Sequence, residues 1–186
     1  MIDQTHVVGV FGRRGSGKTT WARDFLKKQS RVVVFDPYKE YGFSAYTYRL
    51  SFGGLLQALD ASQDTDRLSV IPELTYDAFE EFCEGVMDLK NSWIAFDEIN
   101  LFTSSMKQHD AFDLLVRTSR RNNTSILVVS QRPVGIPPIV LSQANRLILY
   151  HLHSERDLAP LKDIVTPEDL DTIRILPPHQ HLDISL

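Results

Sequence analysis

Short segments with continuous apolar runs constrain the fold of this chain more than any other feature. Residues 31–35 (RVVVF) and 125–130 (SILVVS) carry branched apolar side chains at consecutive positions, without the alternation of a half-exposed strand. Such a strand is buried on both faces, as in a parallel sheet that helices cover from each side. Strands are also expected at residues 6–11, 67–71, 93–96, 146–151 and 181–184.

Segments with helical spacing separate these strands. In residues 18–29, the side chains of Trp21, Ala22, Phe25 and Leu26 fall on one face of a helix. The alternation of strands and helices predicts an α/β fold, with a central, mostly parallel sheet flanked by helices on both faces. The length of 186 residues favours one domain, residues 1–186. Further helices are expected at residues 52–60, 75–89, 110–121 and 154–164.

Composition excludes several classes of protein. The formal net charge of −4 gives no general affinity for nucleic acid, so contact with a polyanion needs a local basic patch. Cys83 is the only cysteine, which excludes an intramolecular disulfide and favours a reducing, intracellular location. No apolar run approaches the roughly 18 residues that span a bilayer, and the amino terminus lacks the pattern of a signal peptide. We therefore expect no membrane span.

The segment Gly12–Thr19 (GRRGSGKT) has the spacing Gly-x-x-x-x-Gly-Lys-Thr of a phosphate-binding loop, also called Walker A. Its glycines let backbone N–H groups approach phosphate oxygens, and the next helix directs its N-terminus at them. Lys18 is expected to reach the β- and γ-phosphates of ATP, and the Thr19 hydroxyl to bind Mg²⁺. The position between an expected strand and an expected helix favours this interpretation over a chance glycine-rich turn. The expected nucleotide contacts are Gly12, Arg13, Arg14, Gly15, Ser16, Gly17, Lys18, Thr19 and Thr20.

Two adjacent carboxylates follow the apolar strand at residues 93–96. Asp97 fits the Walker B position, which holds Mg²⁺ through its water shell, and Glu98 would then orient and polarise the attacking water. The alternative is that the two acids cap a helix, an interpretation that the phosphate-binding loop makes less favoured. A glutamate directly after the Walker B aspartate favours hydrolysis of ATP over phosphoryl transfer to a small molecule.

Polar residues near residues 125–130 complete the candidate site. Gln131 ends this buried strand, so its amide is expected to contact the γ-phosphate or the lytic water; the alternative is that it satisfies loop backbone. Arg117, Arg120 and Arg121 end the preceding helix, where cations interact favourably with the helix dipole. Three arginines exceed what capping requires. We expect at least one of them to act in trans as an arginine finger on a neighbour's γ-phosphate.

Together these residues resemble the FtsK/HerA branch of P-loop motor ATPases, in particular the small genome-packaging ATPases of membrane-containing icosahedral viruses. The resemblance extends over about residues 6–150 and is carried by GRRGSGKT, by FDPYKEYG after the second strand, by the FDE of Walker B and by RTSRRNNTSILVVSQRP. Walker A is shared with many families, whereas the SQRP and DPYKEY segments discriminate better. The resemblance implies a P-loop NTPase fold of the RecA-like, additional-strand type.

The resemblance also implies a function. It implies a homo-oligomeric ring that translocates double-stranded DNA, with ATP at subunit interfaces, Arg120 as the arginine finger and Gln131 as the γ-phosphate sensor. Similar small proteins drive a genome into a preformed capsid, so capsid vertex or portal proteins are possible partners. The expected location is then the host cytoplasm or the virion.

Contacts with DNA phosphates would come from cations that face a central channel. The segment at residues 103–109 follows Walker B, and its Lys107 is the first candidate, although a solvated lysine fits nearly as well. Tyr38 and Lys39 are further candidates. Arg13 and Arg14 fit a solvated surface at least as well as a contact with nucleotide or with a neighbouring subunit.

Three other functions are open from the sequence. The chain fits a virion-assembly or secretion ATPase of the filamentous-phage type, although those often carry a transmembrane segment. It also fits a small P-loop kinase, although kinases of this size usually have an arginine-rich lid and lack a water-activating glutamate. A regulatory module that binds nucleotide without turnover is the fourth possibility.

Overall fold

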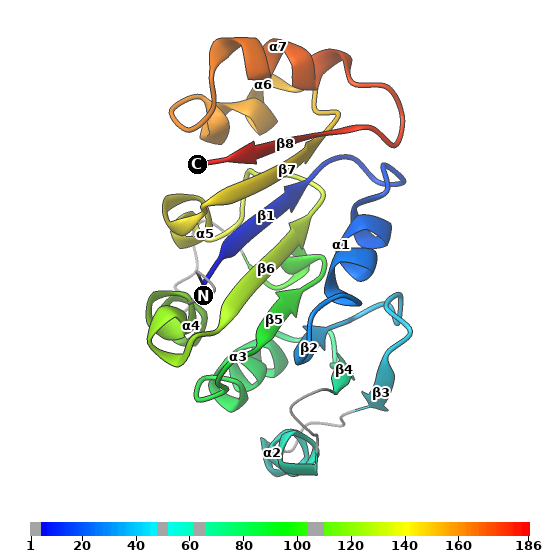
Figure 1. Cartoon of the computed structure of the whole chain (residues 1–186), viewed down its shortest axis with the longest axis vertical. Coiled ribbons are helices and arrows are strands. Elements are labelled where there is room, and N and C mark those ends of the chain that lie inside the picture. The colour runs from blue at the N-terminus through cyan, green and yellow to red at the C-terminus, as the bar shows by residue number, and fades with distance from the viewer. Residues whose placement is uncertain (1–4, 48–51, 62–65, 104–109) are drawn as a thin grey trace.

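A central sheet organises the molecule. The computed structural model describes residues 5–47, 52–61, 66–103 and 110–186, and within these ranges the chain forms an eight-stranded sheet of order β3-β4-β2-β5-β6-β1-β7-β8 (Figure 1). The strands are β1 (Val7–Phe11), β2 (Val32–Phe35), β3 (Ser44–Thr47), β4 (Arg67–Ile71), β5 (Trp93–Phe96), β6 (Ser125–Ser130), β7 (Arg146–Tyr150) and β8 (His181–Ser185).

The strand order confirms the predicted fold class. All neighbouring strands from β3 to β7 are parallel, and β8 pairs antiparallel with β7. Strand β6 lies between β1, which leads into the phosphate-binding loop, and β5, which leads into Asp97. This is the RecA-like, additional-strand arrangement of P-loop NTPases. Because β1, β5 and β6 are adjacent and parallel, the loops after them meet at one edge of the sheet.

Helices cover both faces of the sheet. Helix α1 covers one face, and α3, α4 and α5 cover the other, while α6 and α7 lie beyond the β7–β8 edge (Figure 1). The helices are α1 (Lys18–Leu26), α2 (Phe52–Ala61), α3 (Tyr76–Gly85), α4 (Asp110–Thr118), α5 (Pro138–Gln143), α6 (Glu155–Leu158) and α7 (Pro167–Ile175), with 3₁₀ turns η1 (Ile99–Leu101), η2 (Ser119–Asn122) and η3 (Ala159–Leu161).

The core is divided by the sheet. Successive side chains of β1 point to opposite faces, so Val10 packs with Ala22 and Leu26 of α1, while Phe11 joins the larger cluster on the other face. Every residue of β1, β2 and β6 is buried. The continuous apolar runs therefore have the cause predicted from the sequence, burial on both faces. Cys83 is a free cysteine buried in the larger cluster, in keeping with a packing role.

Several boundaries differ from the predicted ones. The helix predicted at residues 75–89 begins one residue later, because the Thr75 side chain caps it by accepting from the Ala78 amide, and it ends at Gly85. The helix predicted at 110–121 ends at Thr118 and continues as the 3₁₀ turn η2. The helix predicted at 154–164 is divided into α6 and η3, where Pro160 lacks the N–H that an α-helix needs.

Three elements were not predicted. They are β3, α5 and α7. Helix α5 begins at Pro138, directly after Pro137 at its N-cap, and has only six residues. Helix α7 begins with a capping box, in which Thr166 and Asp169 exchange hydrogen bonds, and this signal was present in the sequence.

Candidate active site

The phosphate-binding loop connects β1 to α1 and depends on its glycines. Gly15 and Gly17 have φ angles of +75° and +103°, in the left-handed region where a side chain is strained. A Cβ at Gly12 would collide with the Cβ of Tyr150. The backbone turns tightly, with the Ser16 amide donating to the Arg13 carbonyl at 3.2 Å. The loop therefore ends at the N-terminus of α1, whose free N–H groups favour a bound anion.

Lys18 is a buried cation at the start of α1. Its side chain is 4% exposed, and its Nζ donates to the carbonyl oxygen of Arg13 at 3.1 Å. Burial lowers the pKa of this ammonium, whereas the negative charges of Glu98 and Asp97 act in the opposite direction. A cation that is already desolvated and close to carboxylates is well placed to exchange this contact for phosphate oxygens.

Asp97 lies at the end of β5 and is fully buried. Its Oδ1 accepts a hydrogen bond from the Glu98 amide at 3.1 Å, while its Oδ2 has no hydrogen-bond partner among the described residues. Burial, reinforced by the charges of Glu98, Glu40 and Asp36, raises the pKa of the Asp97 carboxyl to about 8.

The surroundings of Asp97 fit a magnesium ion. Mg²⁺ prefers oxygen ligands and keeps several of its waters, so a buried carboxylate oxygen without a partner suits its hydration shell. Thr19 lies in the first turn of α1 and lines the cleft beside the phosphate-binding loop. A divalent cation held between the two would favour the ionised form of Asp97.

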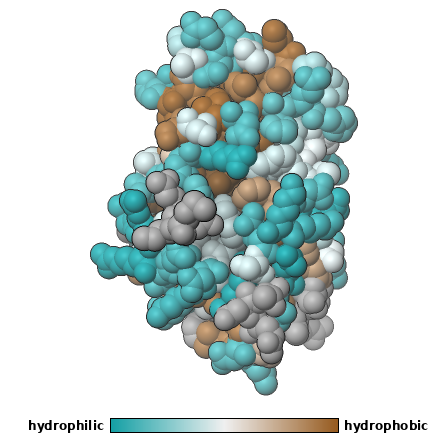
Figure 2. Space-filling model, in the orientation of Figure 1, coloured by the Kyte–Doolittle hydropathy of each residue, from teal (hydrophilic) through white to brown (hydrophobic). Residues whose placement is uncertain are grey.

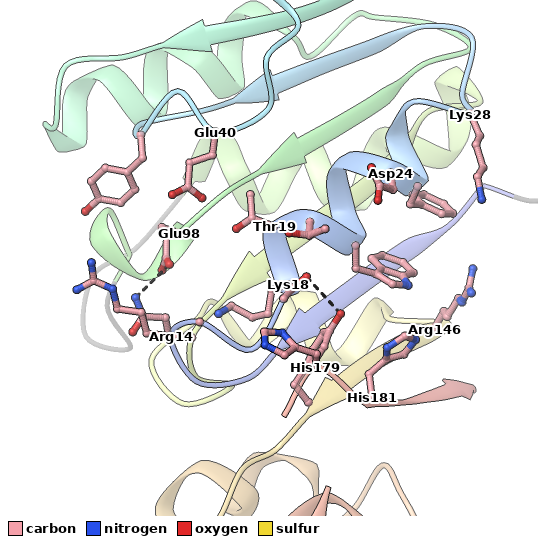
Figure 3. A pocket seen from close by; sticks show the side chains of 18 residues that line it. Arg14, Lys18, Thr19, Asp24, Lys28, Glu40, Glu98, Arg146, His179 and His181 are labelled. Atoms are coloured by element: carbon pink, nitrogen blue, oxygen red, sulfur yellow. Dashed lines mark hydrogen bonds between the residues drawn. The ribbon is translucent and has the colours of Figure 1, made fainter. Parts of the chain in front are cut away.

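Glu98 and Gln131 meet across two adjacent strands. The Nε2 of Gln131, after β6, donates to Oε1 of Glu98, after β5, at 3.0 Å (Figure 3). The other oxygen of Glu98, Oε2, has no partner among the described residues. Glu98 has a φ of +47°, an unusual backbone conformation for this residue type. The two side chains predicted to act on the lytic water thus lie within hydrogen-bonding distance of each other.

The turn after β2 adds an acid that the sequence analysis missed. The buried Asp36 carboxylate accepts hydrogen bonds from the amides of Glu40 (2.9 Å) and Tyr41 (3.2 Å), and Lys39 has a φ of +60°. The Glu40 side chain consequently lines the cleft. Nothing in the local sequence gives the direction of the Glu40 side chain.

Lys18, Thr19, Glu40, Glu98 and Gln131 share one cleft of about 1100 Å³, whereas the buried carboxylates Asp97 and Asp36 do not line it. Figure 3 shows it following α1, with Glu98 and Arg14 toward one end and His181 and Arg146 toward the other. The cleft is lined by Arg14, Gly15, Gly17, Lys18, Thr19, Thr20, Trp21, Asp24, Phe25, Lys28, Tyr38, Glu40, Glu98, Gln131, Arg146, Tyr150, His179 and His181.

The remaining predicted residues lie elsewhere. Arg13 is exposed and does not line the cleft. Arg117, Arg120 and Arg121 are exposed, and η2, which holds Arg120, precedes β6 at the edge of the sheet opposite to the phosphate-binding loop (Figure 1). Lys107 lies outside the described residues, as does the rest of its segment beyond Thr103.

Most of the chain matches the sequence profile of a known family. The sequence profile described as helicase HerA, central domain (DUF87), matches residues 3–132. The chain belongs to this family. The matched range of this HerA-family chain contains the phosphate-binding loop, Asp97, Glu98 and Gln131, whereas β7, β8 and the helices between them lie beyond it. A search of curated protein sequences finds no match.

Solved structures share the fold of this HerA-family chain. The genome packaging NTPase B204 of Sulfolobus turreted icosahedral virus 2, in complex with AMPPCP, has a TM-score of 0.79 at 16% identity, over 98% of this chain and 93% of that one. VirB4 of Thermoanaerobacter pseudethanolicus has a TM-score of 0.65 at 13% identity, over 96% and 88%. The N-terminal domain of zonular occludens toxin from Neisseria meningitidis has a TM-score of 0.52 at 14% identity, over 99% and 94%.

The sequence predicts no membrane span. Among the residues that the structure describes, no helix combines the length and the apolar character needed to cross a bilayer.

Proposed function

We propose that this chain is a Mg²⁺-dependent ATPase whose homo-oligomeric ring translocates double-stranded DNA, in its most specific form to package a viral genome into a preformed capsid. The observation that carries the hydrolytic part is the hydrogen bond from Gln131 to Glu98, in the cleft that Lys18 also lines. Kinases that move a phosphoryl group to another substrate do not require such a water-activating carboxylate. The proposed working unit is one P-loop domain, residues 1–186.

The chemistry of hydrolysis follows from the different contacts of the two Glu98 carboxylate oxygens. Oε1 accepts from Gln131, which leaves Oε2 to take a proton from water as the water oxygen bonds to the γ-phosphorus. The bond from that phosphorus to the bridging oxygen breaks, and the electron pair leaves with ADP. Lys18 offsets the charge on the phosphate oxygens. Thr19 and Asp97 would hold Mg²⁺, which when bound withdraws charge from the β- and γ-phosphates.

Two observations support a motor rather than an isolated hydrolase. The chain belongs to the HerA central-domain family, and a virus packaging NTPase with a nucleotide analogue bound shares its fold. Arg120 is exposed and remote from the cleft of its own chain, as an arginine that acts on a neighbouring subunit must be. Packaging would place the ring on capsid vertex or portal proteins, in the host cytoplasm or on the virion.

Phosphate release from ATP tests the proposal. With Mg²⁺ present and no acceptor, we expect release that rises with double-stranded DNA and more than linearly with protein concentration as rings assemble. Lys18→Ala is the control and should lose productive nucleotide binding, because the β- and γ-phosphates lose their cation. Turnover that DNA does not change would contradict DNA translocation and favour a protein-moving ATPase. Binding without turnover would contradict the ATPase itself.

Mixed assemblies test the role of Arg120 in trans. Arg120→Ala alone should bind ATP normally and lose most assembled-state activity, by about 10³-fold. Mixed with Glu98→Gln chains, some interfaces combine a wild-type Glu98 with a wild-type Arg120, so activity should partly return. Arg117→Ala and Arg121→Ala serve as matched controls from the same turn of the chain. If the mixture stays inactive, Arg120 does not act across the interface.

A further inference from the structure

The cleft has two chemically different ends, and only one suits the γ-phosphate. Glu98 and Gln131 must face the γ-phosphate if they act on the lytic water, which orients the triphosphate along the phosphate-binding loop. The nucleoside must then leave the loop in the other direction, along α1 toward β7 and β8. Figure 3 shows His179 and His181 on that side of Lys18, away from Glu98. This reasoning rests on the proposed ATPase.

One wall of this second end comes from α1. Trp21, Asp24, Phe25 and Lys28 line it at helical spacing. The Trp21 and Phe25 rings are stacked, with centroids 5.1 Å apart. Trp21 is only partly buried, so part of the indole lines open space rather than core.

The opposite wall comes from β7, β8 and the segment that precedes β8. The Tyr150 hydroxyl donates to the Gly17 carbonyl at 3.3 Å and so joins β7 to the phosphate-binding loop. His179 is exposed, and its Nδ1 lies 3.5 Å from where a Cβ on Gly17 would stand. The His181 ring meets Trp21 edge-on at 6.3 Å, which brings the two walls together.

An ion pair joins β7 to β8 within this wall. Arg146 of β7 contacts Asp183 of β8 through two hydrogen bonds, Nε to Oδ1 at 2.9 Å and Nη2 to Oδ2 at 2.6 Å. The Arg146 guanidinium also lies 5.7 Å from the centroid of the Trp21 ring. The strand that carries His181 is thereby held beside α1 before any ligand binds.

We propose that this end of the cleft is a purine-base subsite, in which Trp21 of α1 and His179 of the C-terminal segment contact the base of the nucleotide. An indole and an imidazole offer flat π-faces for a purine, and the ring nitrogens of His179 and the carboxylate of Asp24 offer hydrogen bonds to its edge. Tyr150, His179 and His181 lie beyond the range that the HerA profile matches, so the family assignment does not specify this contact.

The fluorescence of Trp21 reports on the subsite directly. The chain has two tryptophans, so Trp93→Phe leaves Trp21 as the only one. We expect ATP and AMP to change its emission, because both carry the base. Inorganic tripolyphosphate should displace ATP in a competition experiment without reproducing this change. Equal changes with tripolyphosphate, or bound ATP that leaves the emission unaltered, would overturn the proposal.

Removal of one exposed ring measures its contribution. His179→Ala should raise the Kd for ATP about 10-fold, as expected for a base contact, and leave the Kd for tripolyphosphate unchanged. His153→Ala is the matched control, because His153 is exposed and does not line the cleft. Equal weakening of both ligands would mean that His179 only supports the phosphate-binding loop.

These measurements separate the subsite from the ATPase. They report binding and not turnover. If the chain binds ATP through the base but releases no phosphate, the base subsite is supported and the proposed hydrolysis is wrong. A chain that hydrolyses purine and pyrimidine nucleotides with equal KM, and whose Trp21 emission is insensitive to the base, would keep the hydrolysis and reject the subsite.

Discussion

The two ends of the cleft are built in different ways. The phosphate end uses the contiguous segment Gly12–Thr19 and residues that directly follow two neighbouring parallel strands, Glu98 and Gln131. The other end joins α1 to residues far along the chain, as in the hydrogen bond from Tyr150 to Gly17. The phosphate end would bind the phosphate charge through backbone N–H groups and the Lys18 ammonium. The other end offers aromatic rings, and the position of His181 among them depends on strand pairing. Variants of Glu98 and Gln131 at the first end should change catalysis, and variants at the second end should change affinity.

Glu98→Gln should have the largest effect on this comparison. The amide cannot accept the proton of the lytic water, so kcat should fall about 10³-fold, while the Kd for ATP changes less than about threefold. Single-turnover phosphate release and calorimetry measure the two quantities. Glu84→Gln, on α3 outside the cleft, is the matched control. Unchanged turnover would remove Glu98 from its proposed role.

The phosphate end could be predicted from the sequence because its chemistry is local. Gly12, Gly17 and Lys18 occupy fixed spacings that the backbone of one loop requires. Glu98 and Gln131 directly follow buried strands, and parallel strands bring their carboxyl ends to one edge. The strand order itself, with β6 between β1 and β5, came only from the family resemblance.

The other end of the cleft could not be predicted, because its residues come together through long-range contacts and not through a local sequence pattern. His179 and His181 show no metal-ligand spacing, and nothing in the local sequence places them beside the phosphate-binding loop. His181 reaches the cleft because β8 pairs antiparallel with β7, a long-range contact that no local pattern encodes, and His179 lies in the segment that precedes β8. Glu40 was missed because its direction depends on a turn held by the Asp36 carboxylate.

Asp97→Asn should stabilise the metal-free protein in alkaline solution. The pKa of Asp97 is raised to about 8, above its value of about 3.9 in an unfolded chain. The contribution of this carboxyl to the free energy of unfolding is therefore complete below pH 4 and is lost as the pH rises through 8. Asparagine carries no charge, so at pH 9 with EDTA the variant should unfold roughly 5 °C higher than the wild type.

Two further measurements make the Asp97 result specific. At pH 4 the difference in melting temperature should shrink, because both side chains are then neutral. Mg²⁺ with ATP should stabilise the wild type more than Asp97→Asn, since the variant loses the carboxylate that would hold the ion. If the variant is less stable than the wild type at pH 9, burial does not destabilise the ionised Asp97 carboxylate.

Gln131→Ala should have an intermediate effect at the phosphate end. Glu98 loses the donor that holds its Oε1, so the carboxylate is less well oriented and kcat should fall about 30-fold with little change in KM. Gln143→Ala, at the end of α5 and outside the cleft, is the matched control. If KM rises and kcat is unchanged, Gln131 contributes to ATP binding and not to the chemical step.

Asp183→Asn should give the smallest effect, and at the opposite end. The ion pair with Arg146 is partly exposed, with side chains 33% and 42% accessible, so its loss should cost about 0.5 kcal/mol, or about 1–2 °C in melting temperature. The Arg146 hydrogen bond lowers the pKa of Asp183, so this contribution is present above the unfolded value near 3.9 and disappears as the pH falls through the folded value.

The kinetic effect of Asp183→Asn tests whether the second end of the cleft changes ATP affinity without changing the chemical step. Arg146 loses the Asp183 carboxylate that holds its guanidinium beside Trp21. The KM for ATP should therefore rise about twofold while kcat stays unchanged. Asp171→Asn removes another surface ion pair, with Arg174, away from the cleft and should leave KM unaltered. A fall in kcat for Asp183→Asn alone would mean that the two ends are coupled through β7 and the phosphate-binding loop, as the Tyr150–Gly17 hydrogen bond permits.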